Sequence, residues 1–89
     1  MSLVDTVYRI YTEDTDRDAV IGTVAQRFEN FTVHPATGYF KGQPERSIVI
    51  EIVDAHEADV EAVARAIRNI NGQKTVLIMG LRGQVRKIT

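Results

Sequence analysis

The 89 residues have room for one hydrophobic core, because domains run from about 50 to 250 residues. Hydrophobic residues make up 44% of the chain and charged residues 26%, which excludes the disordered class. The absence of cysteine excludes disulfides, thiolate metal sites and cysteine nucleophiles, and favours a cytoplasmic location. A net charge of −1 creates no field that attracts nucleic acid, and no apolar run is long enough for a membrane span. We therefore expect a single cytoplasmic domain over residues 1–89, with neither nucleic acid nor membrane as its partner.

The first third of the chain predicts a strand and then a helix. Residues 4–11 are rich in β-branched and aromatic types and interleave polar with apolar positions, as a half-buried strand does. Thr15 offers a hydroxyl cap with Asp18 three residues on, a variant of the capping box. Apolar residues then recur at the three- and four-residue steps of one helical face: Val20, Ile21, Val24, Ala25 and Phe28.

The middle of the chain predicts a β-hairpin. Residues 31–41 and 47–53 form its arms, and Gly42 and Pro44 break both helix and strand in the connecting turn over residues 42–46. Pro35 cannot donate to a ladder and Gly38 weakens one, which predicts an edge strand with a bulge between them. The second arm is apolar on both sides except at Glu51, which predicts a central strand.

The last third predicts a second helix and at least one more strand. Asp54 provides an acidic start, and the helix stops at Asn71-Gly72. Its apolar face comprises Val60, Val63, Ala64, Ile67 and Ile70. Residues 75–79 read as a strand, Gly80 and Gly83 as a turn, and residues 84–88 as a short additional strand.

The resulting order, β-α-β-β-α-β with a short C-terminal extra strand, defines the α+β class. Right-handed crossovers turn that order into a ferredoxin-like sandwich, in which two helices cover one face of a four-stranded antiparallel sheet. We expect the helices to pack against the second hairpin arm, through Val24, Phe28, Val63 and Ile67 on one side and Ile48, Ile50 and Ile52 on the other.

One face of this sheet is left without a helix. If the isoleucines of residues 48–52 face the helices, alternation places Val49, Glu51 and Val53 on the open side. Large exposed apolar patches are rare on monomers, so we expect self-association as a dimer or trimer. The alternative is that the C-terminal tail folds back over this face.

Few residues suggest a catalytic or metal-binding role. His34 and His56 stand alone, without metal-ligand spacing, so neither a metal nor a cofactor is predicted. Glu51, a carboxylate in an apolar strand, must be paired, protonated or at an interface. It either pairs with a cross-strand cation such as Arg9 or acts as a general acid or base.

The hairpin tip is the other candidate site. Tyr39, Lys41, Glu45 and Arg46 combine an aromatic residue with charges on a turn, where binding residues concentrate, although an ordinary solvated turn has the same composition. No catalytic motif is present, and the third strand lacks the aromatics that RNA-binding relatives of this fold use. The leading hypothesis is a non-enzymatic binding or regulatory module. The alternative is a small enzyme that uses Glu51, His34 and Tyr39 in a cleft.

The sequence of the hairpin resembles an element that occurs in other proteins. The stretch Gly38-Tyr39-Phe40-Lys41-Gly42-Gln43-Pro44-Glu45-Arg46-Ser47 resembles the G-x-[WYF]-[KR]-G-x-x-E-x-S element of small uncharacterised bacterial and phage proteins. Upstream, Asn30 replaces the glycine of their F-x-G-[FY]-T element. The resemblance implies a shared fold and a phage or mobile-element setting, without an activity. The element order is also similar to that of the trimeric CutA and PII-type proteins, whose loop between the second and third strands contacts partners.

Overall fold

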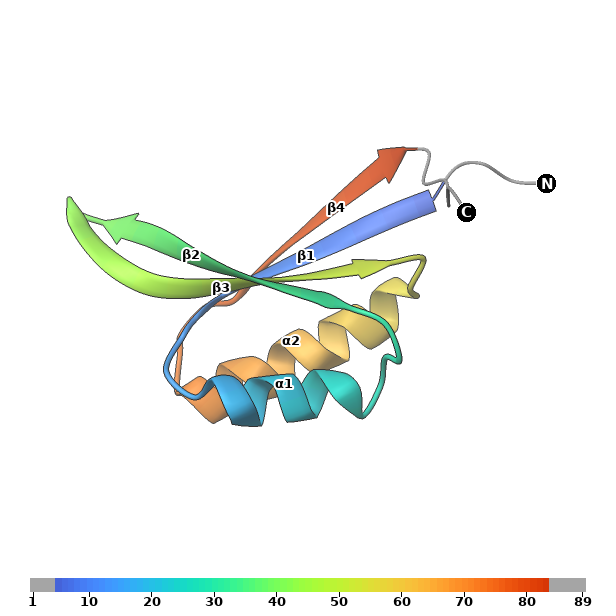
Figure 1. Ribbon diagram of the computed structural model, residues 1–89, viewed down its shortest axis with the longest axis horizontal. Helices are drawn as coiled ribbons and strands as arrows, with labels where there is room; N and C mark the ends of the chain where they lie inside the picture. The colour runs from blue at the N-terminus through green and yellow to red at the C-terminus, as the bar shows by residue number, and fades with distance from the viewer. Residues whose placement is uncertain (1–4, 84–89) are drawn as a thin grey trace.

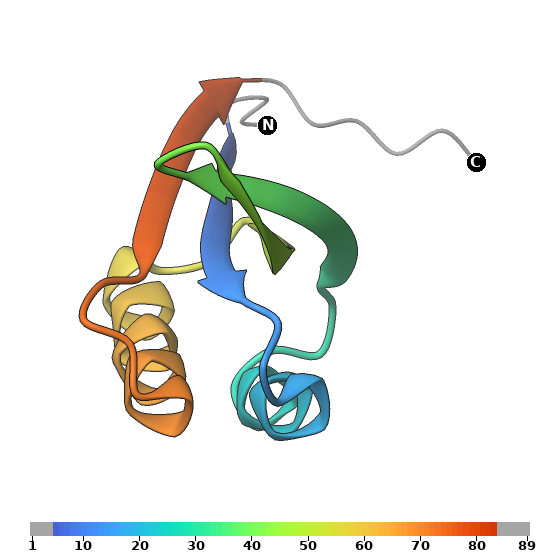
Figure 2. The same cartoon turned by 90° about the vertical axis from the view of Figure 1, so that its left-hand side faces the viewer.

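The computed structural model describes residues 5–83, which form a four-stranded sheet with two helices (Figure 1). The elements are β1 (Asp5–Glu13), α1 (Arg17–Ala25), β2 (Thr32–Phe40), β3 (Gln43–Val53), α2 (Glu57–Asn71) and β4 (Leu77–Gly83). All pairings are antiparallel, in the order β2-β3-β1-β4. Both helices lie against the same face of the sheet (Figure 2). The predicted ferredoxin-like α+β fold is confirmed, while the predicted strand over residues 84–88 lies outside the described residues.

The core forms between the helices and the centre of the sheet. Ile48, Ile50 and Ile52 of β3 are 0–1% exposed. They contact the buried faces of both helices, with Phe28 partly buried at the margin. The buried hydrophobic set is Ile10, Val20, Val24, Ile48, Ile50, Ile52, Val60, Val63, Ala64 and Ile67. The predicted packing is therefore confirmed, and β3 is a central strand as its sequence indicates.

Both helices begin differently from the prediction. Asp16, not Thr15, caps α1, and its side chain accepts a hydrogen bond from the backbone N–H of Ala19. His56 occupies the N-cap position of α2 without a side-chain cap bond, and Asp54 instead has a positive φ of 58° in the turn after β3. The C-terminus of α2 is as predicted, because Gly72 adopts the left-handed cap conformation at φ 65°.

The hairpin between β2 and β3 has a longer second arm and a shorter turn than predicted. Its turn consists of Lys41 and Gly42, both with positive φ, and β3 already begins at Gln43. The predicted bulge between Pro35 and Gly38 is absent, because every residue from 32 to 40 pairs with one residue of β3. Since β2 is an edge strand, Pro35 can lie there with no ladder bond to lose.

Gly80 was predicted to lie in a turn after the last strand, but it lies inside β4. It pairs with Tyr8 of β1, and a Cβ at this position would stand 3.2 Å from the Tyr8 ring. The glycine thus allows the tyrosine ring to cross the neighbouring strand closely. No helix between residues 5 and 83 is long and apolar enough to span a membrane.

Candidate functional site: the open sheet face and the hairpin

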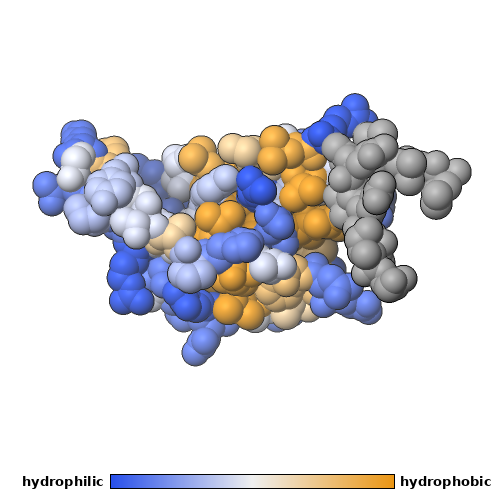
Figure 3. All heavy atoms as spheres, turned by 45° about the horizontal axis from the view of Figure 1, so that its top comes forward, coloured by the Kyte–Doolittle hydropathy of each residue, from blue (hydrophilic) through white to orange (hydrophobic). Residues whose placement is uncertain are grey.

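The sheet face away from the helices is largely apolar and uncovered by the described residues. Cross-strand pairing places Val7 and Tyr11 of β1 opposite Val53 and Val49 of β3, on the side away from the core. On β4 the same side carries three well-exposed residues: Leu77 at 63%, Met79 at 43% and Leu81 at 43%. Figure 3, an oblique view, shows hydrophobic side chains over the body of the sheet and hydrophilic ones on the projecting hairpin.

A single ion pair interrupts this apolar face. Arg9 lies directly across from Glu51, and its Nε donates a hydrogen bond to Glu51 Oε2 at 2.9 Å. The hydrogen bond that Arg9 donates to Glu51 is the main cause that raises the pKa of Arg9 above its usual value. The side chains are 37% and 27% exposed, so both charges remain in partial contact with water. The predicted pairing of Glu51 with a cross-strand cation is confirmed.

The hairpin extends beyond the helices and exposes the residues of its tip (Figure 1). Tyr39 is 74% exposed and Phe40 61%, while Lys41, Glu45 and Arg46 are also exposed. The Lys41 ammonium lies 5.4 Å from the centre of the Phe40 ring, within cation–π range. These side chains protrude as expected, although protrusion alone assigns them no role.

The base of the hairpin is tied to the end of β1 through Asp14. The backbone N–H of Asp14 donates to the carbonyl of Arg46 at 3.0 Å. Its carboxylate, only 6% exposed, accepts hydrogen bonds from Arg17 and lies 3.8 Å from the Arg46 guanidinium. The bonds from Arg17 hold the pKa of Asp14 below its usual value, and the Arg46 charge adds to this more weakly. The hairpin therefore leaves the sheet from a fixed base.

A groove of about 620 Å³ lies where the hairpin curls over the ends of β1 and β4. Aromatic rings and short polar side chains form its walls, as in many small-molecule sites. The lining residues that matter most here are Tyr11, Tyr39, Phe40, Gln73 and Leu77. It is larger than the cavity of about 410 Å³ that Glu13, Phe40 and Gln73 also line.

The residues predicted to carry chemistry do not converge in one copy of the chain. His34 pairs with Val49 and so shares the open face with Glu51, whereas Tyr39 lies at the hairpin tip. The groove that Tyr39 lines contains neither His34 nor Glu51. His56 is exposed at the start of α2. Within residues 5–83, no three His, Cys, Asp or Glu side chains gather in a way that could hold a metal ion.

Sequence reasoning missed a polar cluster at the floor of the groove. The buried Thr12 hydroxyl donates to Gln73 Oε1, and Asn71 Nδ2 donates to Thr12 Oγ1 at 3.0 Å and to the Glu13 carbonyl at 3.1 Å. Thr15 donates to Asn71 Oδ1 at 2.9 Å. The cluster fastens the end of β1 to the loop after α2. The Asn-Gly-Gln sequence after a helix signals only a cap, so nothing in the pattern pointed to these partners.

Comparison with known structures places the fold among small α+β proteins. A DUF3240 family protein from Shewanella baltica OS155 is 14% identical over the full length of both chains, with a TM-score of 0.71. A phage SAM lyase without ligand is 18% identical over 100% of this chain and 96% of its own, with a TM-score of 0.70. CPII, a nitrogen regulatory PII-like protein from Thiomonas intermedia K12 bound to ADP, AMP and bicarbonate, is 11% identical over 97% of each chain, with a TM-score of 0.67.

These likenesses establish the fold alone, because all three identities are below 20%. The first neighbour belongs to a family of unknown function, and the third is described as a nitrogen regulatory PII-like protein. No protein-family model matches the sequence, and no curated protein sequence does either.

Proposed function

We propose that this protein is a small binding or regulatory module that works as a homo-oligomer, in which a second copy covers the open sheet face. The observation that carries the proposal is the exposed apolar surface on the side away from the helices. Val53 on β3 and Leu77, Met79 and Leu81 on β4 are between 42% and 63% exposed there, on the two strands that flank β1. Burial of apolar area contributes roughly 25 cal/mol per Å², so this surface favours association.

The dimensions of the open sheet face show which parts of the molecule an interface with a second copy must include. Four strands at about 4.8 Å spacing and seven residues at about 3.3 Å make a flat area of about 440 Å². A stable interface needs about 800 Å² from each partner. The sheet body alone is therefore too small, and the hairpin must also contact the second copy. Phe40 pairs with Gln43 in register with the open face, so its 61% exposed ring is available for that contact.

The charges on the face suit a second copy of the same chain. Arg9 and Glu51 form one cation and one anion near its centre, already joined by a hydrogen bond. Two such faces therefore meet without an excess of like charge, and neither charge is buried without a partner. The resemblance of the hairpin to bacterial and phage proteins, and the fold shared with a phage SAM lyase, support a phage or mobile-element setting.

Sedimentation velocity tests this assembly. One chain has a mass of 10.0 kDa, so the proposal requires a particle of two or three times that mass at micromolar concentration. Met79→Glu places a charge in the interface and is expected to return the protein to one chain. Ile70→Glu is the matched control, because Ile70 is 39% exposed on α2, away from the open face. A wild-type protein that stays at 10.0 kDa at several hundred micromolar contradicts the proposal.

For the ligand, we propose a small molecule that contains adenosine. The PII-like neighbour binds ADP and AMP, and the substrate named for the phage lyase is SAM, so both handle adenosine compounds. The groove of about 620 Å³ is within the usual range for such ligands, and Tyr11 and Phe40 offer rings for stacking. Calorimetric titration with AMP, ATP and SAM tests this, with uridine monophosphate as a control. Phe40→Ala is expected to weaken binding and Ile70→Ala to leave it unchanged.

A second candidate function is a small enzyme, favoured by the position of Glu51. A carboxylate on an apolar face becomes enclosed when another copy covers it, and enclosed carboxylates serve as acids or bases. His34 shares that face, whereas Tyr39 would have to come from the hairpin of the second copy. Incubation with SAM, followed by mass spectrometry, tests for loss of the substrate. Glu51→Gln should abolish any loss, and an unchanged rate rules Glu51 out; sedimentation velocity of this variant checks whether the loss of the ion pair with Arg9 also weakens the oligomer.

A further inference from the structure

We infer that the cavity between α2 and the start of β4 is a second binding site, which takes the phosphate group of a small metabolite. The cavity measures about 220 Å³ and is lined by Arg65, Arg68 and Lys74 together with Glu61, Thr75 and an apolar floor of Ala64, Val76 and Ile78. It opens on the helix side of the sheet, because Ile78 pairs with the core residue Ile10. The site is therefore separate from the open face and from the groove under the hairpin.

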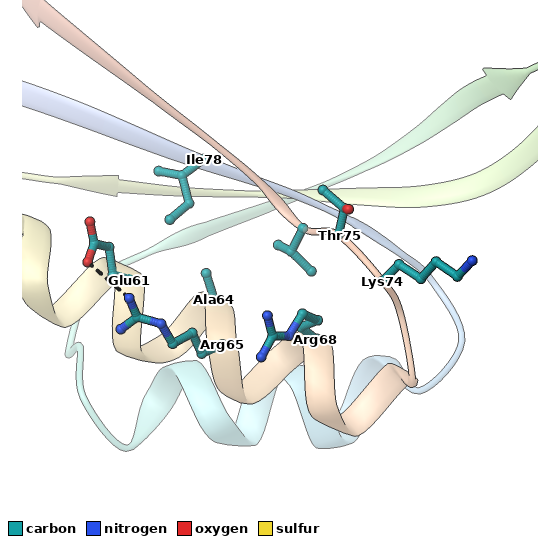
Figure 4. A pocket seen from close by; sticks show the side chains of 8 residues that line it. Glu61, Ala64, Arg65, Arg68, Lys74, Thr75 and Ile78 are labelled. Carbon is teal, nitrogen blue, oxygen red and sulfur yellow. Dashed lines mark ion pairs between the residues drawn. The ribbon is translucent and has the colours of Figure 1, made fainter.

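Figure 4 shows how the charged side chains are arranged around this cavity. Arg65 and Arg68 extend from successive turns of α2, and Arg65 is held by Glu61 at 3.6 Å. The Arg68 guanidinium lies below Thr75, while Lys74 extends away along the loop. Neither Arg68 nor Lys74 has a carboxylate within ion-pair distance among residues 5–83. The lining thus contains three cations and one carboxylate, although the whole chain has a net charge of −1.

The donors at this site match a phosphate group. A guanidinium presents its N–H groups in a planar fork that binds phosphate through two parallel hydrogen bonds. Lys74 can turn on its flexible stem to add a third charge, and the Thr75 hydroxyl can donate as well. β4 is also an edge strand of the sheet that residues 5–83 form, so half of its backbone N–H groups have no strand partner among these residues. A single positive residue at a helix C-terminus is explained by the helix dipole, but this convergence from two elements is not.

The size of the cavity limits the ligand. About 220 Å³ holds about seven water molecules at about 30 Å³ each. That space accepts a phosphate group with a few attached atoms, whereas complete drug-sized ligands occupy about 300–1,000 Å³. The expected ligand is therefore a small phosphate ester or free phosphate, and not a whole nucleotide. This inference does not depend on self-association or on the adenosine ligand proposed above.

NMR titration of the ¹⁵N-labelled protein tests the site at constant ionic strength. The probes are inorganic phosphate and ribose 5-phosphate, with ribose as the uncharged control. We expect saturable shifts confined to the amides near Arg65, Arg68 and Thr75, and none with ribose. Tighter binding of ribose 5-phosphate than of phosphate identifies an ester as the ligand, and equal binding identifies the free anion. Shifts that never saturate, or that spread over all basic surface residues, overturn the inference.

Matched variants separate a built site from general charge attraction. Arg68→Gln should weaken binding by about tenfold or more, the usual effect of losing a charge-assisted hydrogen bond. Arg27→Gln removes the same charge from an exposed arginine that pairs with Asp59, outside the cavity, and should change affinity by less than about twofold. Lys74→Gln and its control Lys41→Gln repeat the comparison for the lysine. Equal losses in Arg68→Gln and Arg27→Gln contradict the site.

Discussion

β3 supplies alternate residues to the two faces of the sheet, and the two sets differ in burial more than in residue type. Ile48, Ile50 and Ile52 are 0–1% exposed beneath the helices, whereas Val53 on the other side is 42% exposed. The covered face is buried because both helices pack against it. The open face has the same apolar character without any cover from residues 5–83, so it is the part of the fold that internal packing does not explain.

The largest expected effect comes from the covered face. Ile50→Ala removes three buried carbon atoms from a site with no access to water and should destabilise the protein by about 2–5 kcal/mol. Val53→Ala on the open face is the comparison, and in the dissociated protein it should cost less than about 1 kcal/mol. Urea denaturation at low protein concentration measures both. Equal costs would mean that the open face is covered within a single chain.

The next effect concerns Thr12, a polar residue that is only 4% exposed. Its hydroxyl is satisfied through Gln73, which also accepts from Asn71 Nδ2 at 2.9 Å. Gln73→Leu removes the acceptor of the Thr12 hydroxyl, while Asn71 Nδ2 keeps Thr12 Oγ1 and the Glu13 carbonyl, and should cost about 1–3 kcal/mol. Lys74→Leu, at the neighbouring exposed position, is the matched control and should cost under about 0.5 kcal/mol. If both variants have the same stability in urea, the cluster does not fasten β1 to the α2–β4 loop.

The lowered pKa of Asp14, at the base of the hairpin, predicts that the stability of the protein depends on pH. Because Arg17 holds its pKa below the unfolded value of about 3.8, the carboxylate stabilises the folded state above that pH. The stabilisation is lost as pH falls through the lower, folded pKa. The difference in melting temperature between the wild type and Asp14→Asn should therefore be full near pH 6 and vanish toward pH 2. A difference that stays constant with pH would show that the charge of Asp14 is not responsible.

The sequence predicts the elements of the fold well because β3 and α2 have unambiguous periodicities. Ile48, Ile50 and Ile52 alternate, and Val60, Val63 and Ile67 recur at helical steps, so both buried faces follow from spacing alone. The errors fall at positions where the prediction relied on the local conformational preference of a single residue. Pro44 and Gly80 were predicted to break strands, yet both lie within them, because cross-strand contacts override local preference.

The candidate sites follow from the sequence only in part. The pairing of Glu51 with Arg9 is predictable from alternation and charge, since both lie on the open face of adjacent strands. The groove and the cavity beside Arg68 are not, because the groove joins segments far apart in the chain and the cavity joins α2 to the loop and strand that follow it. Their lining depends on the curl of the hairpin and on the path of the loop after α2, which no local pattern encodes.

The smallest expected effect is at the hairpin tip, which belongs to neither face of the sheet body. Tyr39 is 74% exposed, so Tyr39→Ala should change stability by less than about 0.5 kcal/mol. Arg46→Ala should do the same, because its side chain is 87% exposed and its guanidinium lies 3.8 Å from the Asp14 carboxylate, where an ion pair contributes little. If the tip binds a partner, both variants should instead weaken that contact, since exposed tyrosine and arginine supply much of the energy at interfaces. Thermal melts and binding of the cognate partner measure the two effects separately. A loss of several degrees in the melting temperature of either variant would place that residue in the fold and end the case for a recognition tip.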